Sequence, residues 1–483
     1  MPDPSLELDD IQGDILIGLQ KDAENFVFFE IADVGSFKSL MKQHVIRQIT
    51  SAQEANRRDV VARQRKRQGE RPLGSLTGLN LGLTKEGLTQ LLGASRPRLD
   101  PSFETGANHR DTVEVLHDPP VSKWLKPFAS GRIDGIFLIT GPNSSVVTFS
   151  TKDLAVQLGR SIKVVYSELG NTRPGARRGF EHFGYRDGIS QPGIRGLTRR
   201  SRPATNPDQG LPGQDLIWPG EFVFGYPGQD PGDAVKPGPP PLMPAPWLRN
   251  GSYMVFRRLE QKVPEFRKFV ADQAAKLGME PDLLGARMFG RWKSGAPLES
   301  APLYDNRALG GDDKRNNDFD YGEDPFQRRC PYAAHIRKAY SRDDAPGGEA
   351  EAQTHRIFRA GITFGPEVAP NETRTVHSRG LMFVCYQTSI ERQFEYIQAR
   401  HANNPDFVPD KVRPGTGAPV TPGFDPIIGQ AVGNGPRAMD EPAPNYPIGN
   451  RRTTLEMPSQ FVVLTAAGYF FMPSITALRT VLT

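Results

Sequence analysis

Strand-like and helix-like patterns occur on both sides of one segment rich in proline and glycine, and this arrangement constrains the fold most. The segment covers 201–247 and includes the run Pro237-Gly238-Pro239-Pro240-Pro241. Such a sequence continues neither a helix nor a central strand. The chain has 483 residues, enough for more than one domain. We therefore expect an N-terminal lobe over 1–230 and a C-terminal lobe over 231–483.

Both halves combine apolar strands with helices. Apolar runs predict strands at 26–31, 80–83, 252–259, 380–388 and 460–471. Helical spacing predicts helices at 84–92, 262–279 and 390–402. Around Gly141-Pro142-Asn143 we expect a hairpin of 135–140 with 145–150, followed by a helix over 152–167. Strand–helix–strand units in both halves indicate an α+β protein with two similar lobes.

Composition excludes several classes of protein. The 60 basic and 55 acidic residues nearly balance, and the basic run at 57–71 has no aromatic stacking residues beside it. We interpret this run as a solvated helix face and expect no nucleic-acid partner. Continuous apolar runs are too short for a transmembrane helix, so we expect no membrane partner. Two cysteines and eight scattered histidines exclude a disulfide framework and a four-ligand zinc site.

Three short blocks carry residues that together point to haem chemistry. They contain Asp187 between Gly184 and Gly188, His335 after two alanines, and Arg359 before Ala360-Gly361. An imidazole is a common axial ligand of haem iron. A carboxylate can move the proton of a bound peroxide, and a guanidinium can stabilise the charge that develops as the O–O bond breaks.

Each residue alone has an ordinary structural interpretation. A lone histidine is more often a half-buried structural residue, a Gly-x-x-Asp-Gly pattern is a common turn, and an arginine at a strand end commonly forms a surface ion pair. The case for a peroxidase therefore depends on the three blocks occurring together.

The combined blocks resemble the dye-decolorizing peroxidases, most closely the long-chain type found in fungi. The likeness runs almost the full length of the chain, through the segments 10–16, 184–192, 334–338, 359–361, 380–387, 423–430 and 469–474. The resemblance implies two ferredoxin-like lobes, each an antiparallel sheet with peripheral helices, and haem b held mainly by the second lobe.

The resemblance also assigns roles to individual residues. It implies that His335 is the proximal iron ligand, Asp187 the distal acid–base group and Arg359 its partner. Arg342 matches an arginine that pairs with a haem propionate, and Asp425 is the candidate acceptor for the second ring nitrogen of His335.

Leu381 and Phe383 match residues that narrow the distal pocket, and strand periodicity puts both on one face. Hydrogen peroxide would then oxidise the haem, and dyes, phenols and other bulky aromatic reductants would return the electrons singly from the surface. Because a carboxylate has an ordinary pKa of about 4, we expect an acidic optimum.

The chain departs from the family pattern at two positions used for electron transfer. Phe364 stands where fungal members often have a tyrosine, and His401 stands where they have a surface tryptophan. We expect Tyr340, and after it Trp247, to be the replacement electron-transfer residues; for Tyr340, a packing or hydrogen-bonding role is the alternative.

Three further possibilities remain open. A haem-binding or haem-handling protein without a peroxidase role would need His335 but gain nothing from Asp187, and a chlorite-decomposing haem protein has no use for that carboxylate. Acidic residues near Tyr340 suggest a manganese(II) site, with a solvated acidic loop as the alternative: Asp343, Asp344, Glu349 and Glu351. Residues 1–20 lack signal-peptide features, so the protein either stays in the cytoplasm or is a mature form whose leader has been removed. The resemblance to secreted fungal proteins favours the extracellular, mature form.

Overall fold

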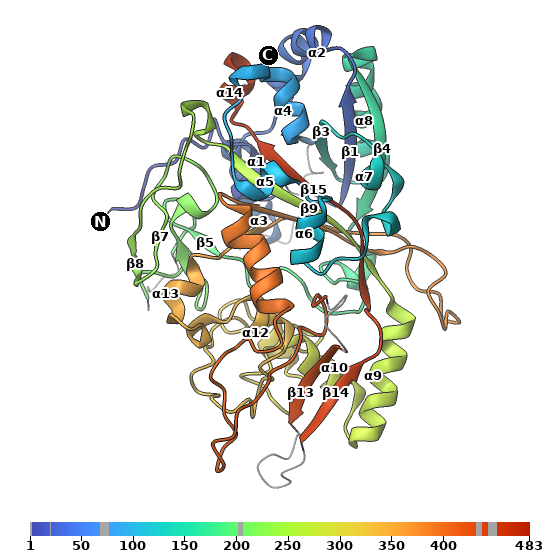
Figure 1. The fold of residues 1–483 in the computed structure, drawn as a ribbon, viewed down its shortest axis with the longest axis vertical. Helices are drawn as coiled ribbons and strands as arrows, with labels where there is room; N and C mark the ends of the chain where they lie inside the picture. Colours follow the sequence, from blue (N-terminus) through green and yellow to red (C-terminus); the bar gives the residue numbers. More distant parts are fainter. Residues whose placement is uncertain (1, 20, 68–76, 201–205, 431–436, 443–451) are drawn as a thin grey trace.

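The centre of the molecule is an antiparallel sheet that closes into a barrel (Figure 1). A computed structural model describes the whole chain except residues 1, 20, 68–76, 201–205, 431–436 and 443–451. The sheet contains β1 (Ala23–Ile31), β2 (Gly78–Leu83), β3 (Gly135–Gly141), β4 (Ile162–Asn171), β9 (Ser252–Gln261), β10 (Phe358–Arg359), β11 (Ile362–Phe364), β12 (Gly380–Gln387) and β15 (Val462–Met472). The strand order is β10-β12-β11-β4-β1-β3-β2-β15-β9, and β12 also pairs with β9, which closes the ring.

Two four-stranded sets of similar topology make up this barrel. The first set is β4-β1-β3-β2; in the second, β10 and β11 form one interrupted strand on the same edge of β12, followed by β9 and β15. In both sets the central pair consists of the first and third strands in sequence, which is ferredoxin-like order. The predicted α+β fold with two ferredoxin-like lobes is confirmed.

The two sets meet through short contacts only. Single residue pairs join them, Phe364 to Gly170 on one side and Phe471 to Leu83 on the other. The predicted domain boundary at residue 230 falls in a hairpin of β7 (Gln229–Asp230) and β8 (Asp233–Pro237), and it stays a prediction.

Helices cover the outside of the barrel (Figure 1). The α-helices are α1 (Gly13–Leu16), α2 (Val34–Leu40), α3 (Ala52–Arg67), α4 (Lys85–Leu92), α5 (Pro101–Thr105), α6 (Arg110–Val115), α7 (Lys126–Ser130), α8 (Ser144–Leu158), α9 (Val263–Leu277), α10 (Pro281–Phe289), α11 (Arg307–Gly310), α12 (His335–Ala339), α13 (Gly348–Gln353) and α14 (Ile475–Thr480). Two π-helices, η10 (Ile390–Glu395) and η11 (Ile397–Ala402), occupy the helix predicted at 390–402. A hairpin of β13 (Arg437–Pro442) and β14 (Arg452–Met457) lies beside α10 in the lower half of Figure 1.

The hairpin predicted around Gly141-Pro142-Asn143 is wrong. Helix α8 begins directly after β3, and the Asn143 side chain caps it by accepting a hydrogen bond from the backbone N–H of Val146. Asparagine is a strong helix N-cap, and this capping outweighs the strand preference of the two valines that follow. The helix predicted at 152–167 therefore ends at Leu158, and β4 follows it.

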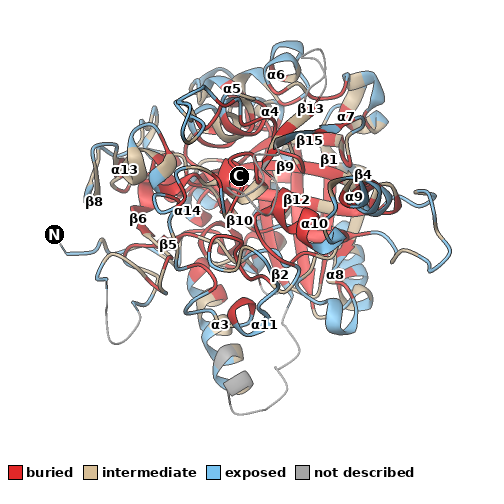
Figure 2. Ribbon diagram, turned by 90° about the horizontal axis from the view of Figure 1, so that it is seen from below, coloured by how far each residue is buried: buried red, intermediate tan, exposed pale blue. Residues whose placement is uncertain are grey.

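Aromatic residues from both lobes fill the barrel. The ring of Phe28 on β1 contacts Phe256 on β9 at 5.0 Å and Phe470 on β15 at 6.0 Å between centroids. All three side chains are fully buried, and Figure 2 shows the buried residues concentrated along the central strands. The lobes thus share one hydrophobic core, and separating them would expose these buried side chains to water.

The described part of the predicted basic run lies on one surface helix, α3. Arg57 and Arg65 lie on this helix, whereas the end of the run, from residue 68, lies outside the described residues. Within the described chain, every helix is too short or too polar to span a bilayer.

Closure of the barrel can be tested at Gly380. A Cβ at this position would lie 1.9 Å from the carbonyl oxygen of Leu259 on the paired strand β9, so Gly380→Ala must push β12 and β9 apart. We expect a loss of about 1–3 kcal/mol in the free energy of unfolding, measured by urea denaturation.

Gly35→Ala in the exposed helix α2 is the matched control. Its nearest neighbour would lie at an ordinary 3.8 Å, so we expect unchanged or slightly higher stability. Equal stability of the two variants would contradict the importance of this strand pair.

Candidate active site

One cavity gathers most of the residues predicted to act. Its lining includes His335, Asp187, Arg359, Arg342, Leu381, Phe383 and Tyr340. These residues come from both sides of the domain boundary predicted from the sequence. Asp425 lies behind His335, and Trp247 is not among the lining residues.

His335 has a fixed orientation at the first position of α12. Its Nδ1 donates to Oδ2 of the buried Asp425 at 2.8 Å, so its Nε2 is the nitrogen available to a metal. The other oxygen of Asp425 accepts the backbone N–H groups of Ile427 and Ile428 at 2.8 and 3.0 Å. The predicted hydrogen bond is therefore present, while iron ligation itself stays a prediction.

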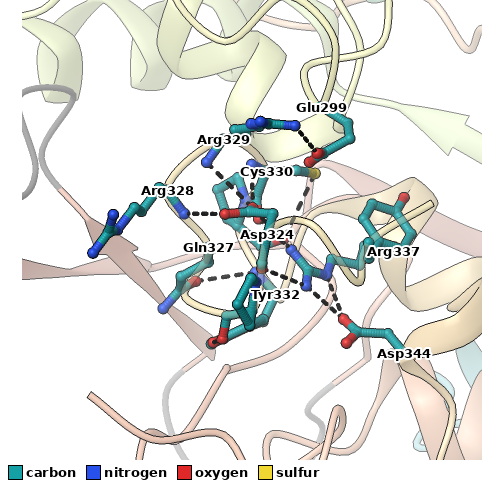
Figure 3. A network of polar contacts seen from close by, with 12 residues as sticks. Glu299, Asp324, Gln327, Arg328, Arg329, Cys330, Tyr332, Arg337 and Asp344 are labelled. Atoms are coloured by element: carbon teal, nitrogen blue, oxygen red, sulfur yellow. Dashed lines mark hydrogen bonds and ion pairs between the residues drawn. The ribbon is translucent and has the colours of Figure 1, made fainter. Parts of the chain in front are cut away.

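A buried ion-pair network holds the helix that carries His335 (Figure 3). Arg337, fully buried, pairs with Asp344 at 2.6 Å and Asp324 at 3.3 Å, and donates to the carbonyl of Cys330 at 2.7 Å. Asp324 also accepts backbone N–H groups of the preceding turn, including that of Cys330. These bonds fix α12, which with five residues is too short to be stable alone.

Asp187 lies in a loop whose turns need glycine. Gly184 and Gly188 have φ values of 101° and 80°, in the region that disfavours other residues. Oδ1 of Asp187 accepts from the backbone N–H of Gly188 at 2.6 Å and from Nη1 of Arg359 at 2.8 Å. The acid and the guanidinium thus form one unit that faces the cavity.

Gln191 joins the Asp187 loop to the strand that carries Arg359. Its side-chain oxygen accepts the backbone N–H of Arg359 at 3.3 Å, and its amide donates to the carbonyl of the same residue. The segment 189–192 belongs to the family-like block, but the sequence alone did not indicate this role.

The charge on Asp187 is set by opposing effects. Burial acts to raise the pKa of this carboxyl, but Arg359 and the Gly188 N–H together outweigh it, so the pKa lies below the ordinary value of 3.8. Asp187 is therefore ionised, as a group that accepts a proton from peroxide must be.

The cavity contains a buried arginine that the sequence analysis missed. Among the described residues, Arg291 donates only to neutral oxygens, those of Gly295, Asn316, Ser190 and Asn317. Burial, followed by the charge of Arg342, lowers the pKa of Arg291 to about 9. A buried cation of this kind needs an anionic partner.

These features fit haem. Arg291 and Arg342 suit the carboxylates of the two propionates, and the free Nε2 of His335 suits the iron. Apolar side chains suitable for the macrocycle complete the wall: Phe289, Ile336, Leu381, Phe383, Phe394 and Ile427. Arg291, in the loop after α10, had no signal in the sequence, because an arginine in a loop usually lies at the protein surface.

The two predicted electron-transfer residues lie in different surroundings. The hydroxyl of Tyr340 donates to Oδ2 of Asp215 at 2.9 Å and also contacts Glu349, and its ring faces the guanidinium of Arg356 at 3.7 Å. Trp247 packs edge-on against Phe471 at 5.5 Å.

A closed α+β barrel with a histidine–carboxylate pair and an acid–arginine pair at one cavity fits a haem-dependent peroxidase. Comparison with known proteins gives the family. Residues 10–174 match the family model "DyP dimeric alpha+beta barrel domain", and 242–419 match "Dyp-type peroxidase, C-terminal". The chain belongs to the dye-decolorizing peroxidase family.

Individual relatives support this assignment. The chain is 37% identical to dye-decolorizing peroxidase msp1 of Mycetinis scorodonius, over 99% of this chain and 88% of that protein. It is 35% identical to a dye-decolorizing peroxidase of Auricularia auricula-judae, over 98% and 86%. A mutant of the Pleurotus ostreatus enzyme superposes with a TM-score of 0.85, at 37% identity over 99% of this chain and 100% of that chain.

The contact between Asp425 and His335 can be tested by haem binding. Asp425→Asn removes the carboxylate that holds the imidazole, and we expect haem affinity to fall about 10–100-fold in an absorbance titration of the haem-free protein. Asp272→Asn, at an exposed ion pair on α9, is the control and should bind as the wild type does. Equal affinities would show that Asp425 does not support the ligand.

Proposed function

We propose that the protein uses hydrogen peroxide to oxidise dyes, phenols and other bulky aromatic compounds by one-electron steps, with haem b as cofactor. The observation that carries this proposal is the 2.8 Å contact of Asp187 with Arg359, facing the same cavity as His335. A haem-binding or haem-handling protein would need the histidine but would gain nothing from this ion pair.

Two residues of this chain, Asp187 and Arg359, can have separate roles in peroxide cleavage. Asp187, ionised because its pKa is lowered, takes the proton that peroxide loses and returns it to the departing oxygen. Arg359 keeps its charge and stabilises the negative charge that develops on the departing oxygen. Haem, when bound, supplies the centre that stores both oxidising equivalents of peroxide.

Other residues that line this cavity would bind the cofactor. His335 would ligate the iron, while Arg342 and Arg291 would pair with propionates. Leu381 and Phe383 also line the cavity. Beside a bound haem, their side chains would narrow the distal side to a space suited to a small molecule such as peroxide. Bulky reductants would then donate electrons at the protein surface.

We propose aromatic compounds as the reductants because a relative with this fold has been solved with a phenol bound. A dye-decolorizing peroxidase solved in complex with 2,6-dimethoxyphenol superposes with a TM-score of 0.81, at 36% identity over 99% of each chain. We also propose an extracellular location, on the resemblance to fungal relatives.

Manganese(II) is the weaker candidate reductant. The carboxylates near Tyr340 already have partners: Asp344 pairs with Arg337 and Lys411, and Glu351 with His355. Throughout the described part of the chain, no three histidine, cysteine or acidic residues gather in a group able to hold a metal ion.

Replacement of Asp187 tests the peroxidase assignment. Asp187→Asn keeps the size of the side chain but removes the proton acceptor, and we expect the rate of reaction with peroxide to fall about 10²–10⁴-fold. Stopped-flow absorbance of the haem band measures this rate, and haem content should stay unchanged. Asp153→Asn, exposed on α8, is the control. A fast reaction in Asp187→Asn would favour the haem-handling alternative.

The dependence on pH tests the pairing of Asp187 with Arg359. Because the pKa of Asp187 is lowered, the wild-type rate should decline only below pH 3.8. In Arg359→Leu, burial still raises the pKa but the guanidinium no longer lowers it. We therefore expect the acid limb of the rate profile to move to higher pH than in the wild type. A limb at the same pH in both proteins would contradict this coupling.

A further inference from the structure

Two histidine rings connect the cavity with a tyrosine outside it. His355 and His401 both line the cavity, whereas Tyr396 is not among the lining residues. Tyr396 stacks on His355, with centroids 3.7 Å apart and rings inclined by 7°, and meets His401 edge-on at 5.1 Å. The phenol is thus one ring removed from the cavity, and it is only half-buried.

The backbone explains why these rings meet. Tyr396 lies between η10 and η11, so the segment has the wide turns of a π-helix. Hydrogen bonds of a π-helix join residues five apart, which is the spacing of Tyr396 and His401. Such turns cost stability relative to an α-helix and are frequent at functional sites.

A carboxylate lies ready to take the phenolic proton. The hydroxyl of Tyr396 donates to Oε1 of Glu351 at 3.3 Å, and Nε2 of His355 lies 3.1 Å from the same oxygen. The second oxygen of Glu351 is buried and lacks a hydrogen-bond partner among the described residues. Glu351 therefore has unused capacity to accept a proton.

His401 is fixed as a neutral spacer between the phenol and the cavity. Its Nδ1 donates to the carbonyl of Lys338 on α12 at 3.2 Å, and its ring stacks on Phe407 at 3.8 Å. Burial lowers the pKa of His401 to about 3, so the ring carries no charge. A neutral ring in contact with Tyr396 shortens the gap that an electron must cross, and it does so without adding positive charge.

We propose that Tyr396 is the residue through which bulky reductants deliver electrons, an inference that rests on the proposed peroxidase function. One electron leaves the phenol for the peroxide-oxidised haem centre, and the phenolic proton moves to Glu351. An aromatic reductant at the surface then returns one electron, and Glu351 returns the proton, so the tyrosine is restored. Each turnover of peroxide uses this cycle twice.

The surroundings favour Tyr396 over Tyr340 for this step. The ring of Tyr340 faces Arg356 at 3.7 Å and Arg342 at 5.4 Å, and these positive charges oppose removal of an electron from the ring. Among the described residues, no arginine or lysine lies over the ring of Tyr396, which stacks on His355 instead.

Replacement of the phenol in the haem-loaded protein tests the proposal. Tyr396→Phe keeps the ring contacts but cannot form a tyrosyl radical. We expect the reaction with peroxide to proceed at the wild-type rate, and the tyrosyl signal in electron paramagnetic resonance after peroxide addition to be lost. Turnover of an anthraquinone sulfonate dye should fall by about tenfold or more.

Glu351→Gln distinguishes electron transfer from a packing role. This variant keeps the phenol and its stacking but removes the proton acceptor, so we expect the same radical signal to form more slowly. Tyr166→Phe is the matched control, because Tyr166 also donates to a carboxylate, that of Glu168, but does not line the cavity. Its radical signal and dye turnover should equal those of the wild type.

The possible failures are separable. A normal reaction with peroxide, together with an unchanged radical signal and dye turnover in Tyr396→Phe, would overturn this inference alone. Loss of the signal in Tyr340→Phe instead would also overturn it. An unchanged haem absorbance on addition of peroxide to the wild type would overturn the proposed function itself, and the inference with it.

Discussion

Antiparallel hydrogen bonding along both edges of β12 holds the barrel closed and shapes one wall of the cavity. One edge pairs with β9 over the full length of β12, and the other pairs with β10 and β11. Because side chains alternate along a strand, Met382 and Val384 are buried in the core while Leu381 and Phe383 line the cavity. The register places Arg359 opposite Cys385, so strand pairing sets the position of the guanidinium that contacts Asp187. Fold and site are therefore determined by the same hydrogen bonds.

The side of the cavity that carries His335 depends on buried charge rather than on a sheet. Arg337 is fully buried two residues after His335, and Asp324 and Asp344 offset much of its cost of desolvation. Hydrogen bonds to the carbonyls of Cys330 and Asp324 add to this. Removal of either acid would leave part of that charge unpaired, which is why such a network permits one arrangement of α12. A rigid helix suits the proposed role of His335 as an iron ligand, because small displacements of a ligand alter the geometry at a metal. The chain thus fixes its two catalytic faces by different physical means.

The sequence predicts the strands well because their apolar runs are continuous and bounded by turns. It fails at 145–150, where two valines favour a strand but a single capping bond from Asn143 begins a helix. It also fails at 162–167, where a helix is predicted but β4 forms. The contact between His335 and Asp425 could be predicted only from the family resemblance, because 90 residues separate them and no periodicity links them. Arg291 and Gln191 gave no usable signal. Arg291 matters because folding brings it close to the charge of Arg342. Gln191 matters because folding brings it close to the backbone of Arg359.

Each of the two departures from the family pattern has its own physical interpretation. Phe364 is buried, and the guanidinium of Arg258 lies 4.2 Å from the centre of its ring. Arg258 is itself held by a bidentate contact with Glu168. A phenylalanine suits this cation contact without a hydroxyl that would need a partner of its own. At the other position, His401 replaces an oxidisable ring but contacts one, Tyr396. The aromatic path from the cavity therefore persists on the side of the π-helices, where a phenol with a carboxylate acceptor lies next to the substituted residue.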